Sequence, residues 1–324
     1  MEKEIKASVI CNTYNHERYI AKCLESLVSQ KTDFYYEIIV HDDASTDSTA
    51  EIIREYEKKY PMIRALYESE NQFSKGVSMW DSTGKYAAGK YFAICEGDDF
   101  WVAPDKLQKQ VDFMESHPEY SLCGHAAYCA FDNDSLSKTN FMRPFSESKD
   151  VTMSDIIRGW AMPTNSFLFQ TRLVSGTPPY QGECRQSDFA LMTFLALQGK
   201  VYYMNELMSA YRIQSATSWT RRISRTPEVR RKMIGEFIAM LDRFDDYTGG
   251  TYHSDIEERK KSVQFNLAVG EGRISDAKQA PELYRALSLK RRMKMYVAAY
   301  VPQAVTIAKR AVDLVYSFRK KPRK

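Results

Sequence analysis

Acidic side chains gather at three places in this chain. They are Asp42 with Asp43, the run Glu96-Gly97-Asp98-Asp99, and Glu183 with Asp188. Adjacent carboxylates repel, so Asp98 and Asp99 at the end of a buried strand are costly unless a cation or hydrogen-bond donors compensate them. Oxygen ligands suit Mg²⁺ or Mn²⁺, which complete their shells with water and substrate phosphates. The pair therefore favours a divalent-metal site, and the alternative is that both acids cap a helix beginning near Pro104.

Several other motifs that bind phosphates or activate water do not occur in the sequence. No GxGxxG follows the first apolar run, and the segment 82–86 lacks the rest of a P-loop. The histidines are scattered, and neither HExxH nor GxSxG occurs. If a nucleotide binds here, a metal and side chains must hold its phosphates.

Alternating strands and helices must position these acids. Apolar runs predict strands at 7–11, 36–40, 63–67 and 91–95. Polar loops follow at 12–15, 42–47 and 96–99. Helices are expected between the strands, over 19–28 and from a cap at Ser45 or Thr46 to Pro61. The alternation favours an α/β fold with a mostly parallel sheet, which binds ligands beyond the carboxyl ends of its strands.

The pattern changes in the second half of the chain. Expected elements are a helix at 104–116, strands at 122–131 and 166–169, and a helix at 186–198. From about residue 227 the spacing is helical, over 228–244, 254–269 and 281–300. We expect a domain at 1–221, a helical C-terminal region at 222–289 and a basic amphipathic tail at 290–324.

Three ordered motifs resemble the family 2 inverting glycosyltransferases of the GT-A fold. They are Ser8-Val9-Ile10-Cys11-Asn12-Thr13-Tyr14-Asn15, then 38–47 with its Asp42-Asp43-Ala44-Ser45-Thr46-Asp47, then Cys95-Glu96-Gly97-Asp98-Asp99-Phe100-Trp101. The match covers about residues 5–220, and the set is more specific than any single motif. The resemblance implies a GT-A catalytic domain that moves a sugar from a nucleoside-diphosphate donor, UDP-linked in the expected case, to an acceptor hydroxyl. Inversion would turn an α-linked donor into a β-linked product.

The resemblance also implies roles for donor-side residues. Asn12 and Tyr14 would lie at the donor, with Tyr14 packed on the nucleotide base. Asp43 would hydrogen-bond the base, and Asp98 would lie near the ribose and phosphates. Asp99 would bind the Mn²⁺ or Mg²⁺ ion that bridges the diphosphate.

On the acceptor side, Asp188 falls where the family carries its catalytic base, and a helix N-cap is the alternative role. A carboxylate there would accept the proton of the attacking hydroxyl, while a metal stabilises the departing diphosphate. The sequence departs from the family pattern at Ser187, where an acid usually precedes the base, and at Gln214, where a His usually lies near the metal or phosphates. Arg212 is expected to contact the diphosphate, with a structural ion pair as the alternative.

Two other functions remain open at this point. A nucleotidyltransferase also uses paired acids and a metal on an α/β sheet. A catalytically inactive sugar-nucleotide-binding scaffold would retain the fold, although the four acids Asp43, Asp98, Asp99 and Asp188 argue against such decay.

Charge is distributed unevenly along the chain. Its net charge is +4, but residues 290–324 hold 11 Lys and Arg with Asp313 as the single acid, which leaves −6 for the first 289 residues. A mildly acidic body is not typical of a nucleic-acid binder, so no nucleic-acid partner is expected. Six cysteines without a CxxC pair, and no signal-peptide run, indicate reduced thiols in the cytoplasm. No apolar stretch reaches the roughly 18 residues of a spanning helix.

The basic tail is expected to lie on a membrane surface. On a helical wheel of 303–318, the polar side chains share an arc of about 120° and apolar side chains fill the rest. Apolar burial and attraction to anionic lipid would act together. This fits a peripheral enzyme at the inner face of the cell membrane, acting on a saccharide or lipid-linked acceptor in surface-polysaccharide synthesis. The alternative is a helix docked on its own protein or on the partner in a homodimer.

Overall fold

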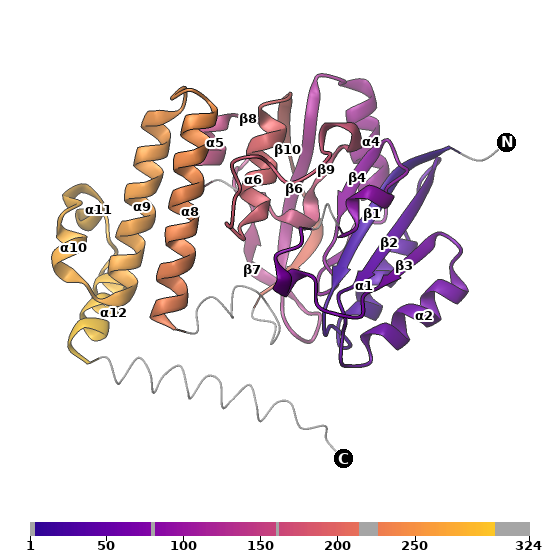
Figure 1. Ribbon diagram of the computed structural model, residues 1–324, viewed down its shortest axis with the longest axis horizontal. Coiled ribbons are helices and arrows are strands. Elements are labelled where there is room, and N and C mark those ends of the chain that lie inside the picture. Colours follow the sequence, from indigo (N-terminus) through magenta and orange to yellow (C-terminus); the bar gives the residue numbers. More distant parts are fainter. Residues whose placement is uncertain (1–3, 79–81, 160–161, 214–225, 302–324) are drawn as a thin grey trace, which may run out of the picture. The chain divides into compact units, whose positions relative to one another are not determined.

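The computed structural model describes residues 4–78, 82–159, 162–213 and 226–301 of the chain. The chain divides into two compact units, Met1–Arg225 and Thr226–Lys324 (Figure 1). The expected boundary at 221 and the tail beyond residue 301 lie outside the described residues. Residues 290–301, expected as part of a separate tail, belong to the second unit.

A ten-stranded sheet organises the first unit. Its main path runs β3-β2-β1-β4-β9-β6-β10-β5, with β7 paired to β6 and β8 paired to β10. The first four strands are β1 (Ile5–Thr13), β2 (Tyr35–Asp42), β3 (Ile63–Tyr67) and β4 (Tyr91–Ile94). The others are β5 (Phe100–Trp101), β6 (Tyr120–Ala130), β7 (Leu136–Met142), β8 (Lys149–Val151), β9 (Leu168–Gln170) and β10 (Lys200–Arg212).

The sheet is mixed. The pairs β1–β2, β1–β4 and β2–β3 are parallel, so the first hundred residues form the parallel half that the alternation predicts. In the other half β6–β10 is parallel, whereas β9 runs antiparallel to both β4 and β6. Strand β9 therefore joins the two halves.

Strands β5, β7, β8 and β10 are absent from the sequence-based expectation. In β10 the polar pair Asn205-Glu206 interrupts the apolar pattern, and the pairing with β6 absorbs it by shifting register between Met204 and Leu207. Strand β7 is largely exposed, so its sequence has no buried alternation to reveal it. The local sequence pattern does not reveal a strand that forms mainly because it pairs with a neighbouring strand.

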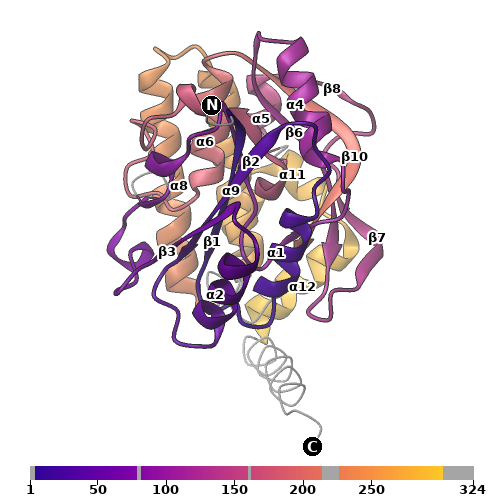
Figure 2. The same cartoon turned by 90° about the vertical axis from the view of Figure 1, so that its right-hand side faces the viewer.

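Helices α1 (Ile20–Val28), α2 (Thr49–Lys59) and α4 (Lys106–Ser116) pack on the parallel half. Helix α1 buries Ile20, Cys23, Leu24 and Leu27 at helical spacing against β1, β2 and β4 side chains. Figure 2 shows α1 and α2 next to β1 to β3. Helix α2 begins at Thr49 with Ser48 at the N-cap position, so the expected caps at Ser45 and Thr46 are wrong. Both residues instead form hydrogen bonds with Asn15 in the loop after β1.

The remaining elements of this unit are short. Helices α5 (Met153–Ile157) and α6 (Ser187–Ala196) contact each other, and α6 also contacts β6 and β10. Single 3₁₀ turns lie at Phe73–Lys75 (η1), Gly84–Tyr86 (η2), Thr164–Ser166 (η3) and Thr171–Leu173 (η4).

The second unit is helical. It contains α8 (Pro227–Tyr247), α9 (His253–Glu271), α10 (Ile274–Lys278), α11 (Pro281–Arg285) and α12 (Leu289–Tyr300), and Figure 1 shows α8 and α9 side by side. The expected helix 281–300 is interrupted because the Ser288 hydroxyl caps a new helix by accepting from the Arg291 N–H. Gly272 ends α9 at φ 71°, where a Cβ would lie 2.4 Å from the Ala299 nitrogen, so this turn requires glycine. Nowhere in the described chain does a helix combine the length and apolarity needed to cross a membrane.

Candidate active site

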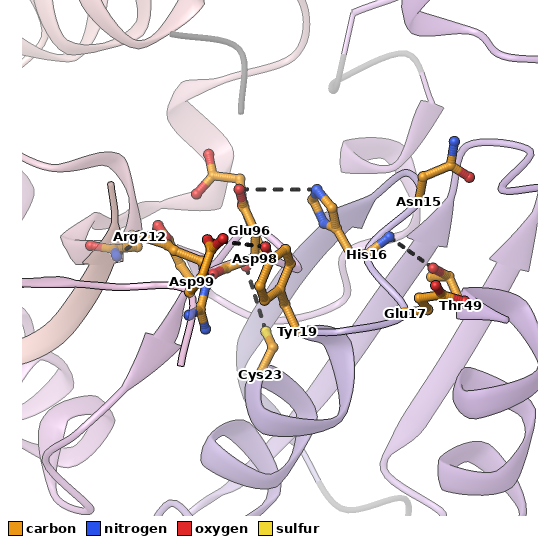
Figure 3. A network of polar contacts seen from close by, with 12 residues as sticks. Asn15, His16, Glu17, Tyr19, Cys23, Thr49, Glu96, Asp98, Asp99 and Arg212 are labelled. Carbon is orange, nitrogen blue, oxygen red and sulfur yellow. Dashed lines mark hydrogen bonds and ion pairs between the residues drawn. The ribbon is translucent and has the colours of Figure 1, made fainter. Parts of the chain in front are cut away.

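The polar loops that follow β1, β2 and β4 meet at one edge of the sheet, as parallel pairing requires (Figure 3). The Gly97 N–H donates to the Asn12 carbonyl at 2.9 Å, and the Asp43 N–H donates to the Thr13 carbonyl at 3.0 Å. A Cβ on Gly97 would lie 2.7 Å from the Thr13 side chain, so only glycine permits this approach. The three sequence motifs are thus one structural feature.

The first two loops are held in strained conformations. Asn15 and Ala44 have φ of 56° and 59°, values that residues with a Cβ rarely adopt. The Asn15 N–H donates to the Ser45 hydroxyl at 2.9 Å, and the Asn15 side-chain oxygen accepts from the Thr46 N–H at 2.7 Å. The His16 N–H donates to the Thr49 hydroxyl at 2.8 Å (Figure 3). These hydrogen bonds hold both loops in their strained backbone conformations, as is common at functional sites.

Asp43 is buried and organises a third loop. Its Oδ1 accepts from the Gln72 N–H at 2.6 Å and its Oδ2 from the Phe73 N–H at 3.2 Å. The backbone of Phe73, whose side chain is exposed, therefore lies beside the candidate base-reading acid. Of the other expected donor residues, Tyr14 is half-buried and the Asn12 side-chain oxygen accepts from the Thr83 hydroxyl at 3.3 Å.

Glu96, Asp98 and Asp99 form the acidic centre of the site. Burial first, and then the charges of Asp98 and Asp188, raise the pKa of Glu96 to about 7. Burial, followed by the charges of Asp98 and Glu96, raises the pKa of Asp99 well above its usual range. The Glu96 Oε2 atom is buried with no hydrogen-bond partner in the described chain. Among the described residues, few positive charges balance this centre.

Asp99 is held on both oxygens. Its Oδ2 accepts from Asn165 Nδ2 and its Oδ1 from the Arg212 backbone N–H, both at 2.8 Å. The alternative that Asp98 and Asp99 cap a helix is wrong, because α4 begins at Lys106 and β5 lies between. Asp98 is the more exposed of the two, and its Oδ2 lies 4.0 Å from His16 Nε2.

The Arg212 side chain is buried, and its guanidinium is bound within the chain. Nη2 donates to Asp134 Oδ1 at 2.7 Å, Nη1 to the Phe131 carbonyl at 2.6 Å and Nε to the Asp98 carbonyl at 2.7 Å. Its carbon Cζ lies 4.4 Å from the centre of the Tyr19 ring. These contacts favour the structural ion pair over the diphosphate contact.

Asp188 lies in the first turn of α6, after Gln186 at the N-cap position. Its Oδ1 accepts from the Phe189 N–H at 2.8 Å, yet the N-cap role expected as the alternative belongs to Gln186. Although Asp188 is exposed, the protein atoms around it remove part of its hydration and raise its pKa. Its charge is the smallest of the named contributions that raise the pKa of Glu96, so Asp188 lies within electrostatic reach of the acidic centre.

The residues of this centre fit a divalent cation. No group of three or more His, Cys, Asp or Glu side chains within the described ranges is arranged to hold a metal. Mg²⁺ and Mn²⁺ are commonly held by one or two carboxylates with water and substrate phosphates. The unpartnered Glu96 Oε2 and the more exposed Asp98 carboxylate supply that type of ligand. Gln214 lies outside the described residues.

Sequence reasoning missed two features of the site. Asn165 is fully buried in η3 and carries no motif, so nothing in its sequence neighbourhood indicates its bond to Asp99. Glu96 was part of the acidic run, but its unpartnered oxygen depends on burial that only the fold reveals.

Comparisons with known proteins bear on the fold and the family. The chain is 30% identical over 215 residues to uncharacterized proteins of Mycobacterium tuberculosis and Mycobacterium bovis, a match of 65% of this chain that spans only 60% of their length. It is 30% identical over 210 residues to TuaG of Bacillus subtilis, which carries a provisional name as a teichuronic acid biosynthesis glycosyltransferase, covering 64% of this chain and 78% of TuaG.

Two solved structures share the fold. Residues 1–349 of S. aureus TarS in complex with UDP-GlcNAc give a TM-score of 0.52 at 18% identity, covering 93% of this chain and 92% of that one. The mannosyltransferase PcManGT from Pyrobaculum calidifontis, in complex with GDP-Man and Mn²⁺, gives 0.55 at 16% identity, covering 94% and 87%. The expected fold class is confirmed. The family model described as glycosyl transferase family 2 matches residues 8–175, slightly more than half of the chain, and the chain therefore belongs to that family.

Proposed function

We propose that this chain is an inverting glycosyltransferase of surface-polysaccharide synthesis. It moves a hexosyl or N-acetylhexosaminyl group from a nucleoside-diphosphate sugar, UDP-linked, to a hydroxyl of a saccharide or lipid-linked saccharide. The observation that carries the proposal is the group of Glu96, Asp98 and Asp99 after β4, at the carboxyl end of the parallel strands, with Asp188 of α6 close enough for its charge to act on Glu96. Relatives named as glycosyltransferases support it, as do fold neighbours solved in complex with UDP-GlcNAc or GDP-Man.

The acceptor side and the donor side of the site have different roles in the proposed reaction. Asp188 is the general base: it accepts the proton of the acceptor hydroxyl as that oxygen attacks the anomeric carbon, and its raised pKa suits a group that must take up a proton. Tyr14 and Asp43 hold the nucleotide base, with Asn12 and Asp98 beside the ribose and phosphates. A bound Mg²⁺ or Mn²⁺ ion would stabilise the charge of the departing diphosphate.

The metal ligand within the cluster has two candidates. The family resemblance assigns Asp99, whereas the burial of Asp99 and the donors on both of its oxygens favour Asp98 together with Glu96. The Mn²⁺ ion in the PcManGT complex supports a divalent cation, not a particular ligand.

The basic region 290–324 is expected to hold the proposed enzyme on the inner face of the cell membrane, where a lipid-linked acceptor is presented. Its +10 balance is the supporting observation. A homodimer through the same region is the alternative.

The test combines a donor screen with product analysis. The purified chain is incubated with UDP-GlcNAc, UDP-glucose and GDP-mannose, with and without Mn²⁺, and a range of saccharide acceptors. Release of a nucleoside diphosphate together with a product of inverted anomeric configuration, read by NMR, is the expected result. In a separate incubation with UTP and a sugar 1-phosphate, release of pyrophosphate together with a new nucleotide sugar would instead identify a nucleotidyltransferase. Donor binding without turnover would identify an inactive scaffold.

A further inference from the structure

Helix α12 carries large apolar side chains on a face that the described residues of its unit leave uncovered. Leu289, Met293 and Tyr300 are 76%, 60% and 75% exposed, and Tyr296 and Val297 are also exposed. On the same helix Met295 is 0% exposed and packs with Phe265 and other core residues. The helix is therefore anchored by one side and presents apolar atoms on another.

Helical geometry shows how separate these two sides are. At about 100° per residue, the five exposed apolar side chains fall within one arc of about 100°. We call this arc the α12 stripe, comprising Leu289, Met293, Tyr296, Val297 and Tyr300. Met295 points about 150° away from the centre of the stripe. An exposed apolar stripe of this size, opposite the packed side, indicates an interaction surface.

The charges of α12 indicate which partner fits. The helix contains Lys290, Arg291, Arg292 and Lys294 and no acidic residue. Lys290 and Lys294 border the stripe on one side and Arg292 on the other, by the same helical geometry. Two stripes of two copies facing each other would bring these cations together without a neutralising acid. An anionic lipid surface neutralises them while its acyl region receives the apolar side chains.

We propose that the α12 stripe docks on an anionic bilayer, with the helix lying in the plane of the surface and the stripe seated at the level of the headgroups. The rings of Tyr296 and Tyr300, stacked with centroids 6.2 Å apart, are of the type enriched at membrane interfaces. This deepens the proposed membrane association by naming the face, and it does not depend on the transfer reaction.

Vesicle sedimentation of the full-length chain tests the stripe. The vesicles are phosphatidylcholine alone or phosphatidylcholine with phosphatidylglycerol. Replacing Leu289→Ser, Met293→Ser and Tyr300→Ser together should weaken binding to anionic vesicles by about tenfold or more. The matched control replaces two exposed tyrosines elsewhere, Tyr35→Ser and Tyr247→Ser, and should bind as the unaltered chain does.

A charge variant keeps the test valid if the triple variant folds poorly. Lys290→Gln with Lys294→Gln should weaken binding to anionic vesicles, and raising the salt concentration should weaken binding of the unaltered chain in the same direction. Binding to phosphatidylcholine alone should change little with either treatment.

Three results would overturn the proposal. The first is unaltered vesicle binding by the stripe and charge variants, with loss only when Ile307, Leu314 and Phe318 become Ser. The second is a dimer, seen by light scattering, that the stripe variant converts to a monomer while vesicle binding is unchanged. The third is equal binding to vesicles with and without phosphatidylglycerol. Sugar transfer to a water-soluble acceptor, measured on the same variants, separates failure of the stripe from failure of the proposed enzyme activity.

Discussion

Asn165 donates a hydrogen bond from Nδ2 to Asp99 Oδ2 at 2.8 Å, and this bond fixes one acid of the candidate metal site from a different part of the chain. The same Asn165 amide donates to the Ala210 carbonyl at 3.1 Å and accepts from the Ser209 hydroxyl at 2.8 Å. Hydrogen bonds therefore connect Asp99 to Asn165 in η3 and to the Arg212 N–H in β10. Because the contact lies in the buried interior, it holds Asp99 in one orientation.

Removing this amide should disturb the metal site. Asn165→Ala leaves Asp99 Oδ2 without its donor, which we expect to cost about 1–3 kcal/mol in the free energy of unfolding. Metal-dependent nucleotide binding, measured by calorimetry, should weaken by about tenfold. Ser209→Ala is the control, because it removes a partner of Asn165 without touching Asp99. If both variants bind metal and nucleotide as the unaltered chain does, Asn165 has no positioning role.

Replacing Asp98 and Asp99 by Asn, one at a time, should identify the metal ligand. Asp98→Asn should reduce the Mn²⁺ dependence of nucleotide binding while leaving stability nearly unchanged. Asp99→Asn should lower the unfolding temperature first, since its new amide would face the donors Asn165 Nδ2 and the Arg212 N–H. Calorimetry with and without Mn²⁺, beside thermal unfolding, separates the effects. A stable Asp99→Asn chain that has lost its metal dependence would restore the assignment made from the family motif.

The part of this site that local sequence could predict is the part built from strand ends. Asn12, Asp43 and Asp98 each follow an apolar strand, and parallel pairing necessarily brings such loops together. Asp188 could be placed because it precedes an apolar helix within a known family pattern. Periodicity and motif order were sufficient there.

What could not be predicted depends on long-range packing. Arg212 lies at the end of β10, a strand hidden by its polar pair at 205–206. The sequence offered an ion pair of Arg212 as an alternative but could not identify Asp134 as the partner. Asn165 is buried where η3 meets Asp99 and the end of β10, which are distant in the sequence. The burial of Glu96 Oε2 is likewise visible only in the fold. The exposed stripe on α12 likewise required knowing that Ser288 starts a new helix and that Met295 is its packed side.

Asp43 should affect nucleotide binding without any involvement of metal. Asp43→Ala removes the acceptor for the Gln72 and Phe73 N–H groups, so this loop loosens and the proposed contact to the base disappears. Nucleotide affinity should fall by about tenfold or more, equally in the presence and absence of Mn²⁺. Asp47→Ala serves as a nearby acid control. A change confined to the metal-bound state would contradict the assignment of Asp43 to the base.

Asp188 should be needed for turnover and not for donor binding. Asp188→Asn keeps the shape of the side chain but cannot accept the proton of the attacking hydroxyl, so turnover should fall by at least about 100-fold. Calorimetric affinity for the sugar nucleotide should change little. Glu183→Gln removes a nearby exposed acid and should leave turnover intact. Near-normal turnover in Asp188→Asn would exclude Asp188 as the base.

Glu96 should make stability depend on pH in a defined window. Burial raises the pKa of Glu96 from 4.5 to about 7, so between these values the folded chain keeps a proton that the unfolded chain has lost. The free energy of unfolding should therefore fall as the pH rises from about 4.5 to 7, by about 1.4 kcal/mol for each unit of pKa difference at most. Glu96→Gln carries no titrating proton and should lose less stability over the same window.

A divalent cation should reverse this loss, because it stabilises the deprotonated carboxylates that repel one another without it. At pH 7.5, Mg²⁺ or Mn²⁺ should raise the unfolding temperature of the unaltered chain more than that of Glu96→Gln, whereas at pH 5 the two chains should respond alike. Thermal unfolding with EDTA or with metal, at both pH values, measures both effects. If metal raises the two unfolding temperatures equally at pH 7.5, Glu96 does not contribute to the cation site.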